Sequence, residues 1–362
     1  MTSPHPVLAA EIGLQLGTLD LDISLSIAPG EVVALLGPNG AGKTTVLRAL
    51  SGLQPIDRGH ITLDDTVLDC GRDGPMPQPP EQRAIGVVFQ DYLLFPHLSV
   101  LDNVAFGPRS RGASRREANA AAIVWIERVG LAEYEAAKPS AISGGQAQRA
   151  ALARALATDP RLLLLDEPLA ALDASTRATV RRDLRRHLDE FEGVTVLVTH
   201  DALDALALAD RVVILEDGSV TQDGLIGEVT DRPRTPYVAE LLGVNLLRGQ
   251  ARDGLDGDHL VDLDGARSVV TIAERAVGAT LLLIRPSSIS LHRNRPDSSA
   301  RNRWHCQISG FDLLGDHVRV RLSGDIDLVA EVTPSAVGEL GLVEGSSVWA
   351  SVKATDITVY PG

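Results

Sequence analysis

The stretch Gly37-Pro38-Asn39-Gly40-Ala41-Gly42-Lys43-Thr44 decides the fold class of this chain. It follows the apolar run 31–36 and precedes the segment 45–50, whose pattern is typical of a helix. A glycine loop between a strand and a helix is the setting in which this pattern indicates a nucleotide phosphate site. The glycines let backbone N–H groups point at an anion, and the helix N-terminus adds a favourable dipole. We therefore expect this loop and Thr45 to bind phosphates, with Lys43 on the outer phosphates and the Thr44 hydroxyl on Mg²⁺.

Two acidic residues follow a second apolar run. Leu162–Leu165 predicts a buried strand, and Asp166 and Glu167 stand at its carboxyl end. Paired acids in such a place can also belong to a solvated turn. Here four successive leucines hold the strand end close to the sheet edge where ligands bind. The pattern predicts Asp166 as a Mg²⁺ ligand and Glu167 as the general base that polarises an attacking water.

A serine and two glycines stand at the start of another helical segment. Ser143-Gly144-Gly145-Gln146 precedes the pattern 147–157. Ser-Gly-Gly by itself indicates only a turn, but at a helix start it forms a second anion-binding surface. One ATP cannot easily use this surface and the phosphate loop of the same chain if the two lie on different lobes. We therefore expect a second subunit to supply it.

Bulk composition limits the function classes. The chain has 362 residues and a formal net charge of −14, which argues against general nucleic-acid binding. Its two cysteines, Cys70 and Cys306, are too far apart in the sequence to suggest a disulfide framework or a metal site. No signal-peptide pattern and no run of membrane-spanning length is present, so we expect a soluble, cytosolic chain whose membrane role needs a partner.

The alternation of strands and helices predicts the organisation of the chain. Apolar strands at 85–89, 162–165, 194–198 and 212–215, separated by helical segments, predict an α/β P-loop fold with a parallel sheet. Residues 91–158 predict a mostly helical subdomain. After Gly243 the chain consists of short strand-like runs, which predict one or two small OB-like β-barrels. We expect three segments, an ATPase domain at 1–243, a β-rich connecting region at 244–296 and a terminal domain at 297–362.

Together these motifs resemble the ATPase subunits of ABC transporters over residues 7–243. Ile142–Gln146 is similar to the family signature, with Ile in place of the usual Leu. The resemblance implies that Gln90 touches Mg²⁺ and the attacking water, and that Asp173 crosses the interface of an ATP-bound homodimer. It also implies that His200 contacts the γ-phosphate.

One position departs from the family pattern. The family usually carries an aromatic residue before the phosphate loop that stacks on adenine, and this chain has no Phe, Tyr or Trp before Phe89. An aliphatic residue such as Leu19 would then contact the base through apolar surface alone. We expect weak selectivity between nucleotide bases.

The C-terminal segment resembles a molybdate- and tungstate-binding domain of the Mop type over about residues 297–360. Ser299-Ala300-Arg301-Asn302 and Lys353-Ala354-Thr355 carry the resemblance, and 284–289 is similar to the regulatory barrels of importer ATPases. A tetrahedral dianion needs several hydrogen-bond donors and positive charge. The resemblance implies an oxyanion site at Ser299, Arg301, Asn302, Lys353, Ala354 and Thr355, formed between two subunits. Without the resemblance, these residues would be strand ends that face water.

The expected function is therefore that of an ATPase that energises import of molybdate, or a similar oxyanion, through a membrane permease and carries a regulatory oxyanion-binding tail. The expected partners are a second copy of the chain, integral-membrane permease subunits, an extracytoplasmic binding protein acting indirectly, and the oxyanion. The expected cofactors are ATP and Mg²⁺. The segment 91–98 is expected to help form the groove for a permease helix at the cytoplasmic face of the membrane. An importer of tungstate, sulfate, sugar or iron stays open as an alternative, and a soluble ABC ATPase without transport is a more distant one.

Overall fold

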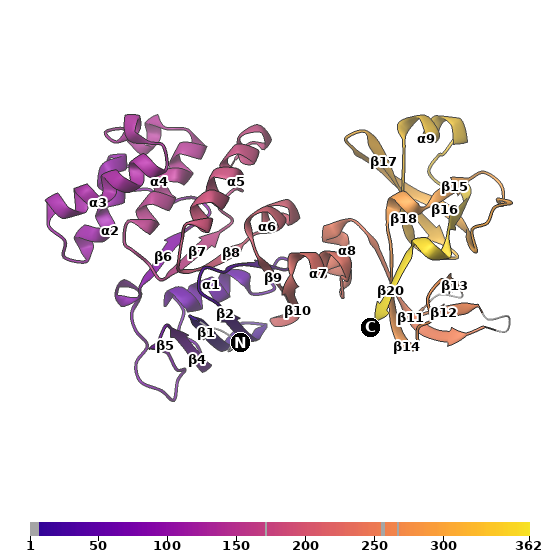
Figure 1. The fold of residues 1–362 in the computed structure, drawn as a ribbon, viewed down its shortest axis with the longest axis horizontal. Helices are drawn as coiled ribbons and strands as arrows, with labels where there is room; N and C mark the ends of the chain where they lie inside the picture. The colour runs from indigo at the N-terminus through magenta and orange to yellow at the C-terminus, as the bar shows by residue number, and fades with distance from the viewer. Residues whose placement is uncertain (1–6, 171, 255–257, 266–267) are drawn as a thin grey trace. The chain divides into compact units, whose positions relative to one another are not determined.

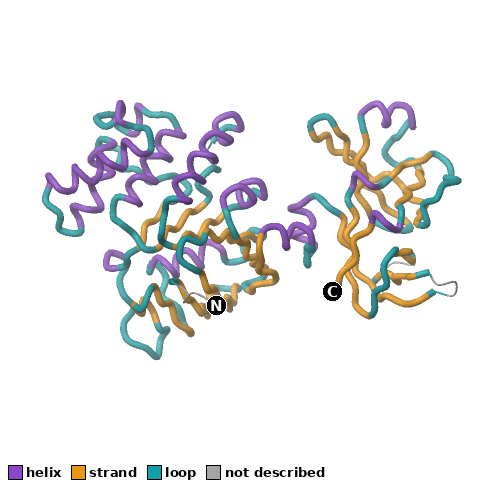
Figure 2. The backbone as a smooth tube through the Cα atoms, in the orientation of Figure 1, coloured by secondary structure: helices purple, strands orange, loops and turns teal. Residues whose placement is uncertain are grey.

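The computed structural model describes residues 7–170, 172–254, 258–265 and 268–362. The chain divides into two compact units, residues 1–226 and 227–362. Helices and strands alternate in the first unit, whereas strands predominate in the second (Figures 1 and 2). Each unit is described below by itself.

A ten-stranded sheet forms the frame of the first unit, in the order β5-β4-β1-β2-β10-β9-β3-β8-β7-β6. The strands β9, β3, β8, β7 and β6 pair in parallel, whereas β5, β4, β1 and β2 form an antiparallel extension. The bounds are β1 (Leu8–Leu16), β2 (Leu19–Ile27), β3 (Val32–Leu36), β4 (Arg58–Leu63), β5 (Thr66–Asp69), β6 (Ile85–Val88), β7 (Leu162–Asp166), β8 (Val194–Val198), β9 (Arg211–Glu216) and β10 (Ser219–Leu225).

In a parallel sheet, helices cover both faces, so the side chains on both sides of each strand are buried and the strand sequence is apolar along its whole length. All five residues of β3 and of β8 are buried, which explains their unbroken apolar sequence. The predicted α/β class with a parallel sheet is confirmed. This arrangement brings the carboxyl ends of β3 and β7, which carry the phosphate loop and the paired acids, to one edge of the sheet.

Three helices, which begin after Ser99, Ser114 and Ser143, pack together as a helical subdomain (Figure 1), and the third of them also contacts β6. Serine caps begin all three: Ser99, Ser114 and Ser143 each accept a hydrogen bond from a backbone N–H in the first turn. The helix bounds are α1 (Lys43–Ser51), α2 (Val100–Ser110), α3 (Arg115–Arg128), α4 (Gly144–Leu156), α5 (Ala174–Asp189), α6 (Ala202–Leu208), α7 (Ile226–Asp231), α8 (Pro236–Leu242) and α9 (Pro334–Leu340).

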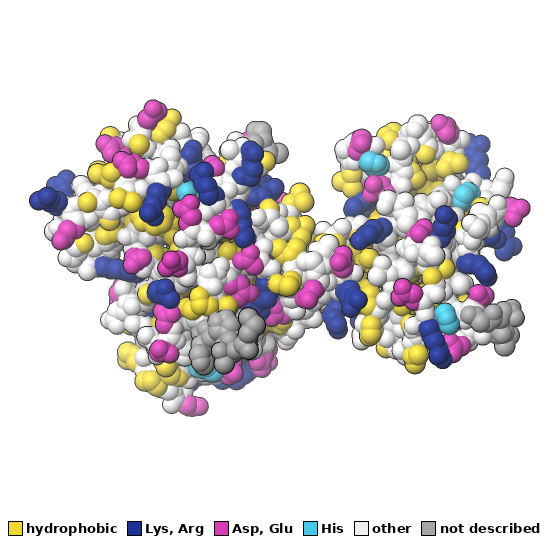
Figure 3. All heavy atoms as spheres, viewed as in Figure 1, with side chains coloured by type: hydrophobic (Ala, Val, Ile, Leu, Met, Phe, Trp, Pro, Cys, Tyr) yellow, Lys and Arg dark blue, Asp and Glu magenta, His cyan; other side chains and the backbone are white. Residues whose placement is uncertain are grey.

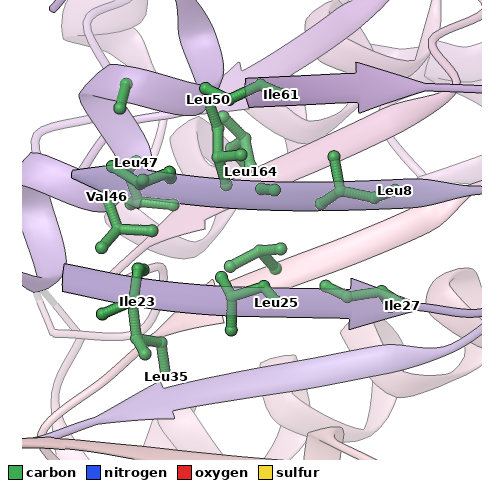
Figure 4. Packing of buried hydrophobic residues seen from close by; sticks show 14 of the residues in the cluster. Leu8, Ile23, Leu25, Ile27, Leu35, Val46, Leu47, Leu50, Ile61 and Leu164 are labelled. Atoms are coloured by element: carbon green, nitrogen blue, oxygen red, sulfur yellow. The ribbon is translucent and has the colours of Figure 1, made fainter. Parts of the chain in front are cut away.

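Helix α1 is fixed at both ends. Its apolar face packs against β1, β2 and β4 in the main core, where Figure 4 shows Val46, Leu47 and Leu50 beside the strands. At its C-terminus the guanidinium of Arg83, which is 1% exposed, donates to the carbonyls of Ala49 (3.0 Å) and Leu50 (2.7 Å). A buried arginine that satisfies the last carbonyls of a helix restrains that helix. The phosphate loop at the other end of α1 therefore rests on a fixed support.

Two five-stranded antiparallel sheets form the second unit, in the orders β13-β12-β11-β14-β20 and β15-β19-β16-β17-β18. The predicted small all-β C-terminal region is confirmed. The strand bounds are β11 (Asn245–Asp253), β12 (His259–Leu263), β13 (Val269–Ile272), β14 (Gly278–Ile284), β15 (Ser290–His292), β16 (Asn302–Leu314), β17 (His317–Gly324), β18 (Leu328–Val332), β19 (Ser347–Val352) and β20 (Ile357–Pro361).

The two sheets are built on the same plan and exchange their last strands. The order β11 to β15 corresponds to β16 to β20, but β15 pairs with β19 and β20 pairs with β14. The first strand of each half begins with an asparagine whose side chain bonds the backbone of the other half. Asn245 bonds Val329, and Asn302 bonds Thr271. Segments 244–296 and 297–362 therefore share sheets. Their division into a connecting region and an oxyanion domain stays a prediction about function.

The surface is polar and carries charges of both signs. Figure 3 shows acidic and basic side chains interspersed over the visible face of both units. Within the ranges that the structure describes, no helix is both long enough and apolar enough to span a membrane.

Candidate nucleotide site and C-terminal anion site

The phosphate loop joins β3 to α1 and contains positions that only glycine can occupy. A β-carbon on Gly37 would lie 2.0 Å from the carbonyl oxygen of Leu215, so the close approach of β9 excludes a side chain. Gly42, with φ +108°, is the N-cap of α1 and has no side chain to accept from the first-turn N–H groups. These groups lack a side-chain cap in the described part of the chain. An anion is the partner that such a helix end accepts.

Lys43 lies folded under this loop. Its Nζ donates to the carbonyls of Gly37 (2.7 Å) and Pro38 (2.8 Å), and the side chain is buried. Burial lowers the pKa of Lys43, while the nearby carboxylates of Glu167 and Asp166 act in the opposite direction. A buried ammonium held by carbonyls at the loop is already in place for phosphate oxygens.

Asp166, Glu167 and His200 meet at the carboxyl ends of β7 and β8. The N–H of Glu167 donates to the carbonyl of Val198 (2.9 Å), which extends the β7–β8 pairing by one step. Glu167 has φ +45°, a conformation uncommon outside glycine and characteristic of functional sites. His200 Nδ1 lies 3.0 Å from Glu167 Oε1. The sheet therefore places the predicted base beside the predicted switch histidine.

The charges at this edge fit a divalent cation. Burial raises the pKa of Asp166, the negative charge of Glu167 raises it further, and Arg48 and Lys43 lower it. Thr44 and Asp166 also line one small cavity of about 70 Å³, together with Phe89. A hydroxyl and a partly buried carboxylate beside a second carboxylate are a donor set that Mg²⁺ accepts. The residues present therefore fit Mg²⁺ at Thr44 and Asp166, and the exposed Gln90 follows Phe89 at the end of β6.

Two leucines of β2 lie against the phosphate loop, where the chain has no aromatic residue. A β-carbon on Gly42 would come within 2.9 Å of Leu21 Cδ1 and 3.4 Å of Leu19 Cδ2. Leu16 pairs directly with Leu19 and is 47% exposed. The side chains that face the loop from this hairpin are therefore aliphatic.

We expect this chain to discriminate poorly between ATP and GTP. Aliphatic side chains make non-directional apolar contact with a purine ring and do not distinguish the polar groups at its edge. The kcat/KM values for ATP and GTP should therefore differ by less than about tenfold, or about 1.4 kcal/mol. Phosphate release measured with each nucleotide on the same preparation tests this. A preference for ATP well above that value would show that another residue contacts the adenine edge.

Ser143 and Gln146 hold the start of α4 in a reciprocal capping box. Ser143 Oγ accepts from the N–H of Gln146 (3.3 Å), and Gln146 Oε1 accepts from the N–H of Ser143 (2.7 Å). Gly145 packs close to α5, where an added β-carbon would lie 3.3 Å from Thr176 Cγ2. Asp173 Oδ1 accepts from the N–H of Thr176 (3.1 Å) at the start of the same α5. The predicted nucleotide contacts at Ser143, Gly144, Gly145, Gln146 and Asp173 stay predictions.

The strand register brings the two predicted anion-binding segments of the second unit together. Asn302 pairs with Val352 at the start of β16 and the end of β19, so 299–301 precede and 353–355 follow one paired position. Segments 50 residues apart in the sequence therefore lie at the same end of one sheet. Ser299, Lys353 and Thr355 are exposed there, and Ala354 is half-buried.

The contacts of these residues divide them into two groups. The buried Asn302 uses its amide on the backbone of Thr271, donating to the carbonyl (2.8 Å) and accepting from the N–H (2.7 Å). This pairing makes Asn302 a structural contact between the sheets within one chain. Arg301 lies 3.5 Å from Asp258 in an exposed ion pair, and both Arg301 and Asn302 line a cavity of about 660 Å³. The exposed residues are thus the ones available to a ligand from outside.

Two arginines near the nucleotide site were not predicted. Arg48, one turn along α1 from Thr44, lines the same cavity as Asp166. Arg177 on α5 bonds both Leu172 and Asp201, beside the predicted Asp173 and His200. The spacing Arg177, Arg181, Arg185 places three arginines on one helix face and was visible in the sequence. The carboxylates that accept their hydrogen bonds lie on other elements, so the sequence did not indicate this pairing.

Family models match both parts of the chain. Residues 21–170 match the model described as ABC transporter, and residues 298–359 match the model of the TOBE domain. A dimeric structure of an ATP-binding cassette in a post-hydrolysis state, bound to ADP and Pi, is 30% identical with a TM-score of 0.51. It covers 60% of this chain and 98% of that chain.

Relatives extend over nearly the whole length. The molybdenum import ATP-binding protein of Mycobacterium tuberculosis is 40% identical over 94% of this chain and 94% of its own length. The Fe(3+) ions import ATP-binding protein of Streptomyces coelicolor is 39% identical over 94% of this chain and 92% of its own. The names of these relatives agree on import and differ in the imported ion.

Proposed function

This chain belongs to the ATP-binding proteins of ABC import systems, and from that premise we propose that it energises import of molybdate or a similar oxyanion. In this proposal two copies close around ATP and act on permease subunits at the cytoplasmic face of the membrane. An extracytoplasmic binding protein would deliver the anion to the permease. The observation that carries the oxyanion assignment is the register of β16 and β19, which joins the segments 299–302 and 353–355.

ATP binding in this proposal uses one edge of the parallel sheet. Lys43 and the N–H groups at the start of α1 would bind the phosphates, and Thr44, Asp166 and Gln90 would hold Mg²⁺. When bound, Mg²⁺ neutralises charge on the phosphate oxygens. The capped start of α4, with Ser143 and the close-packed Gly145, then binds the ATP held by the other copy. The solved cassette dimer with ADP and Pi supports this pairing of two chains.

Hydrolysis in this proposal depends on the pair formed by Glu167 and His200. Glu167 accepts a proton from the attacking water, because a carboxylate next to the phosphate site is the base available there. His200, whose Nδ1 lies 3.0 Å from that carboxylate, holds it in place and contacts the γ-phosphate of bound ATP.

The helical subdomain offers a face for the permease. Leu93 and Phe106 are 54% and 46% exposed, and the rings of Phe106 and Phe95 lie 4.6 Å apart. Tyr92 and Leu93 both have positive φ, and Arg154 of α4 donates to their two carbonyls at 2.8 and 2.7 Å. This arginine holds the backbone of a turn just after Gln90 in which Tyr92 is buried and Leu93 is exposed. A helix of the permease fits such a surface.

Calorimetric titration of the full chain tests the oxyanion assignment. We expect molybdate and tungstate to bind and sulfate to bind at least about tenfold more weakly, as expected for a Mop-type site selective for larger tetrahedral anions. In the variant Ser299→Ala/Lys353→Ala, molybdate affinity should fall by about tenfold or more, because a charged donor is lost. Asn302 is left unchanged, since removing its bonds to Thr271 would loosen the sheets.

Lys138→Ala is the control for this titration. Lys138 is an exposed lysine of the first unit, so the change removes the same charge at a position outside the segments 299–302 and 353–355. The control should keep wild-type affinity. Binding of ferric ion in place of molybdate would favour the iron alternative that the Streptomyces relative suggests. Titration with ATP present also tests regulation, because any coupling between the two sites must be reciprocal.

A further inference from the structure

Helix α5 is joined to α6 and its flanking loops by a row of ion pairs. Arg177, Arg181 and Arg185 are four residues apart and therefore share one face of α5. They pair in order with Asp201 (3.2 Å), Asp204 (2.7 Å) and Asp210 (2.9 Å). The row runs from the start of α6, next to His200, to the start of β9.

The first member of the row joins two loops of the nucleotide site. Arg177 Nη1 donates to Asp201 Oδ2, and Nη2 donates to the carbonyl of Leu172 at 3.4 Å. Leu172 directly precedes Asp173, and Asp201 directly follows His200. Asp201 also caps α6 by accepting from the N–H of Leu203 (2.8 Å), so its carboxylate is held in place. One guanidinium therefore connects the loop after Glu167 to the loop that carries His200.

The hydrogen bonds of Arg177 are longer than those at the far end of the row. Arg185 also binds a carbonyl and a carboxylate, but at 2.7 Å to Leu208 and 2.9 Å to Asp210, and it pairs in addition with Asp189 (2.8 Å). The Nε of Arg177 is buried and has no hydrogen-bond partner among the residues that the structure describes. Long bonds and an unused buried donor indicate a contact that a small shift of either loop would tighten or break.

We propose that Arg177 is a positioning residue that couples the 172–173 segment to the placement of His200. The inference rests on the proposed function, in which Asp173 meets the second copy and His200 acts on the γ-phosphate. When the second copy binds, the 172–173 segment moves with it, and Arg177 transmits this shift through Asp201 to the histidine. Hydrolysis then proceeds only when the partner has docked.

Steady-state hydrolysis and equilibrium ATP binding by the full chain test the proposal. Arg177→Met and Asp201→Asn should each lower kcat by about tenfold or more, while the Kd for ATP stays within about twofold. Asparagine still caps α6, so Asp201→Asn removes only the charge facing Arg177. The double variant should be no slower than the slower single variant, because both changes remove one contact.

Arg185→Met is the matched control. It removes one carbonyl contact and two carboxylate contacts from the same helix, so it should lower the melting temperature at least as much but keep kcat within about twofold. Equal kcat for Arg177→Met and Arg185→Met, or additive losses in the double variant, would overturn the proposal. If Arg177→Met does not fold, Asp201→Asn alone decides. Absence of ATP hydrolysis in the wild type would instead reject the proposed function.

Discussion

Replacing Glu167 by glutamine should slow ATP hydrolysis by about 10² or more while leaving ATP binding intact. Glutamine keeps the size of the side chain but cannot accept the proton of the attacking water. It also keeps an oxygen for His200, which lies 3.0 Å away, so the local packing changes little. The ATP-bound dimer should then accumulate, because it reopens only after hydrolysis.

Phosphate release, equilibrium ATP binding and light scattering with ATP measure these three outcomes on one preparation. Glu127→Gln on α3 is the control, since it makes the same chemical change at an exposed carboxylate of the helical subdomain. Near-wild-type hydrolysis in Glu167→Gln would show that another group accepts the proton. Weakened ATP binding would instead assign Glu167 to nucleotide or metal binding.

Replacing Lys43 by alanine should lower the affinity for ATP by about 10²-fold and reduce hydrolysis with it. The change removes a buried ammonium from beside the phosphates, and it leaves the carbonyls of Gly37 and Pro38 without their donor. Loop geometry and phosphate contact are lost together. The pKa of Asp166 should rise further, because Lys43 is one of the two cations that lower it.

The chain has three lysines, so the control is simple. Lys138→Ala changes an exposed lysine near the start of the α4 region and should leave both affinity and kcat unchanged. Equilibrium binding of ATP and steady-state hydrolysis are the measurements. If Lys43→Ala binds ATP as the wild type does and only kcat falls, Lys43 acts on the transition state and not on the bound nucleotide.

Much of the first unit follows from short stretches of sequence. The glycine loop, the leucine strand with its two acids and the serine at the start of α4 are each local, and the structure has a strand or helix where each one predicts it. The sequence also shows that no aromatic residue precedes Phe89, so that none from this part of the chain can stack on the adenine base. That leucines of β2 lie against Gly42 required the pairing of β1 and β2 and the packing of α1.

The second unit was harder to predict because its strands exchange between halves. The side chain of Asn302 is of a type that can bind an anion. Its amide nevertheless bonds the backbone of Thr271, 31 residues earlier in the chain. Which strand pairs with β14 or β19 depends on the packing of two similar sheets, and short strands of similar pattern do not specify that choice.

The sequence by itself predicted the chemistry of the nucleotide site, because its glycines, lysine and carboxylates stand in short contiguous stretches at the ends of predicted elements. The tertiary structure alone decided what joins those residues. It set the 3.0 Å approach of His200 to Glu167, the place of Arg177 between Leu172 and Asp201, and the union of 299–302 with 353–355. The physical reason is that side-chain reach across elements depends on strand order and helix packing, which residues distant in the sequence fix together.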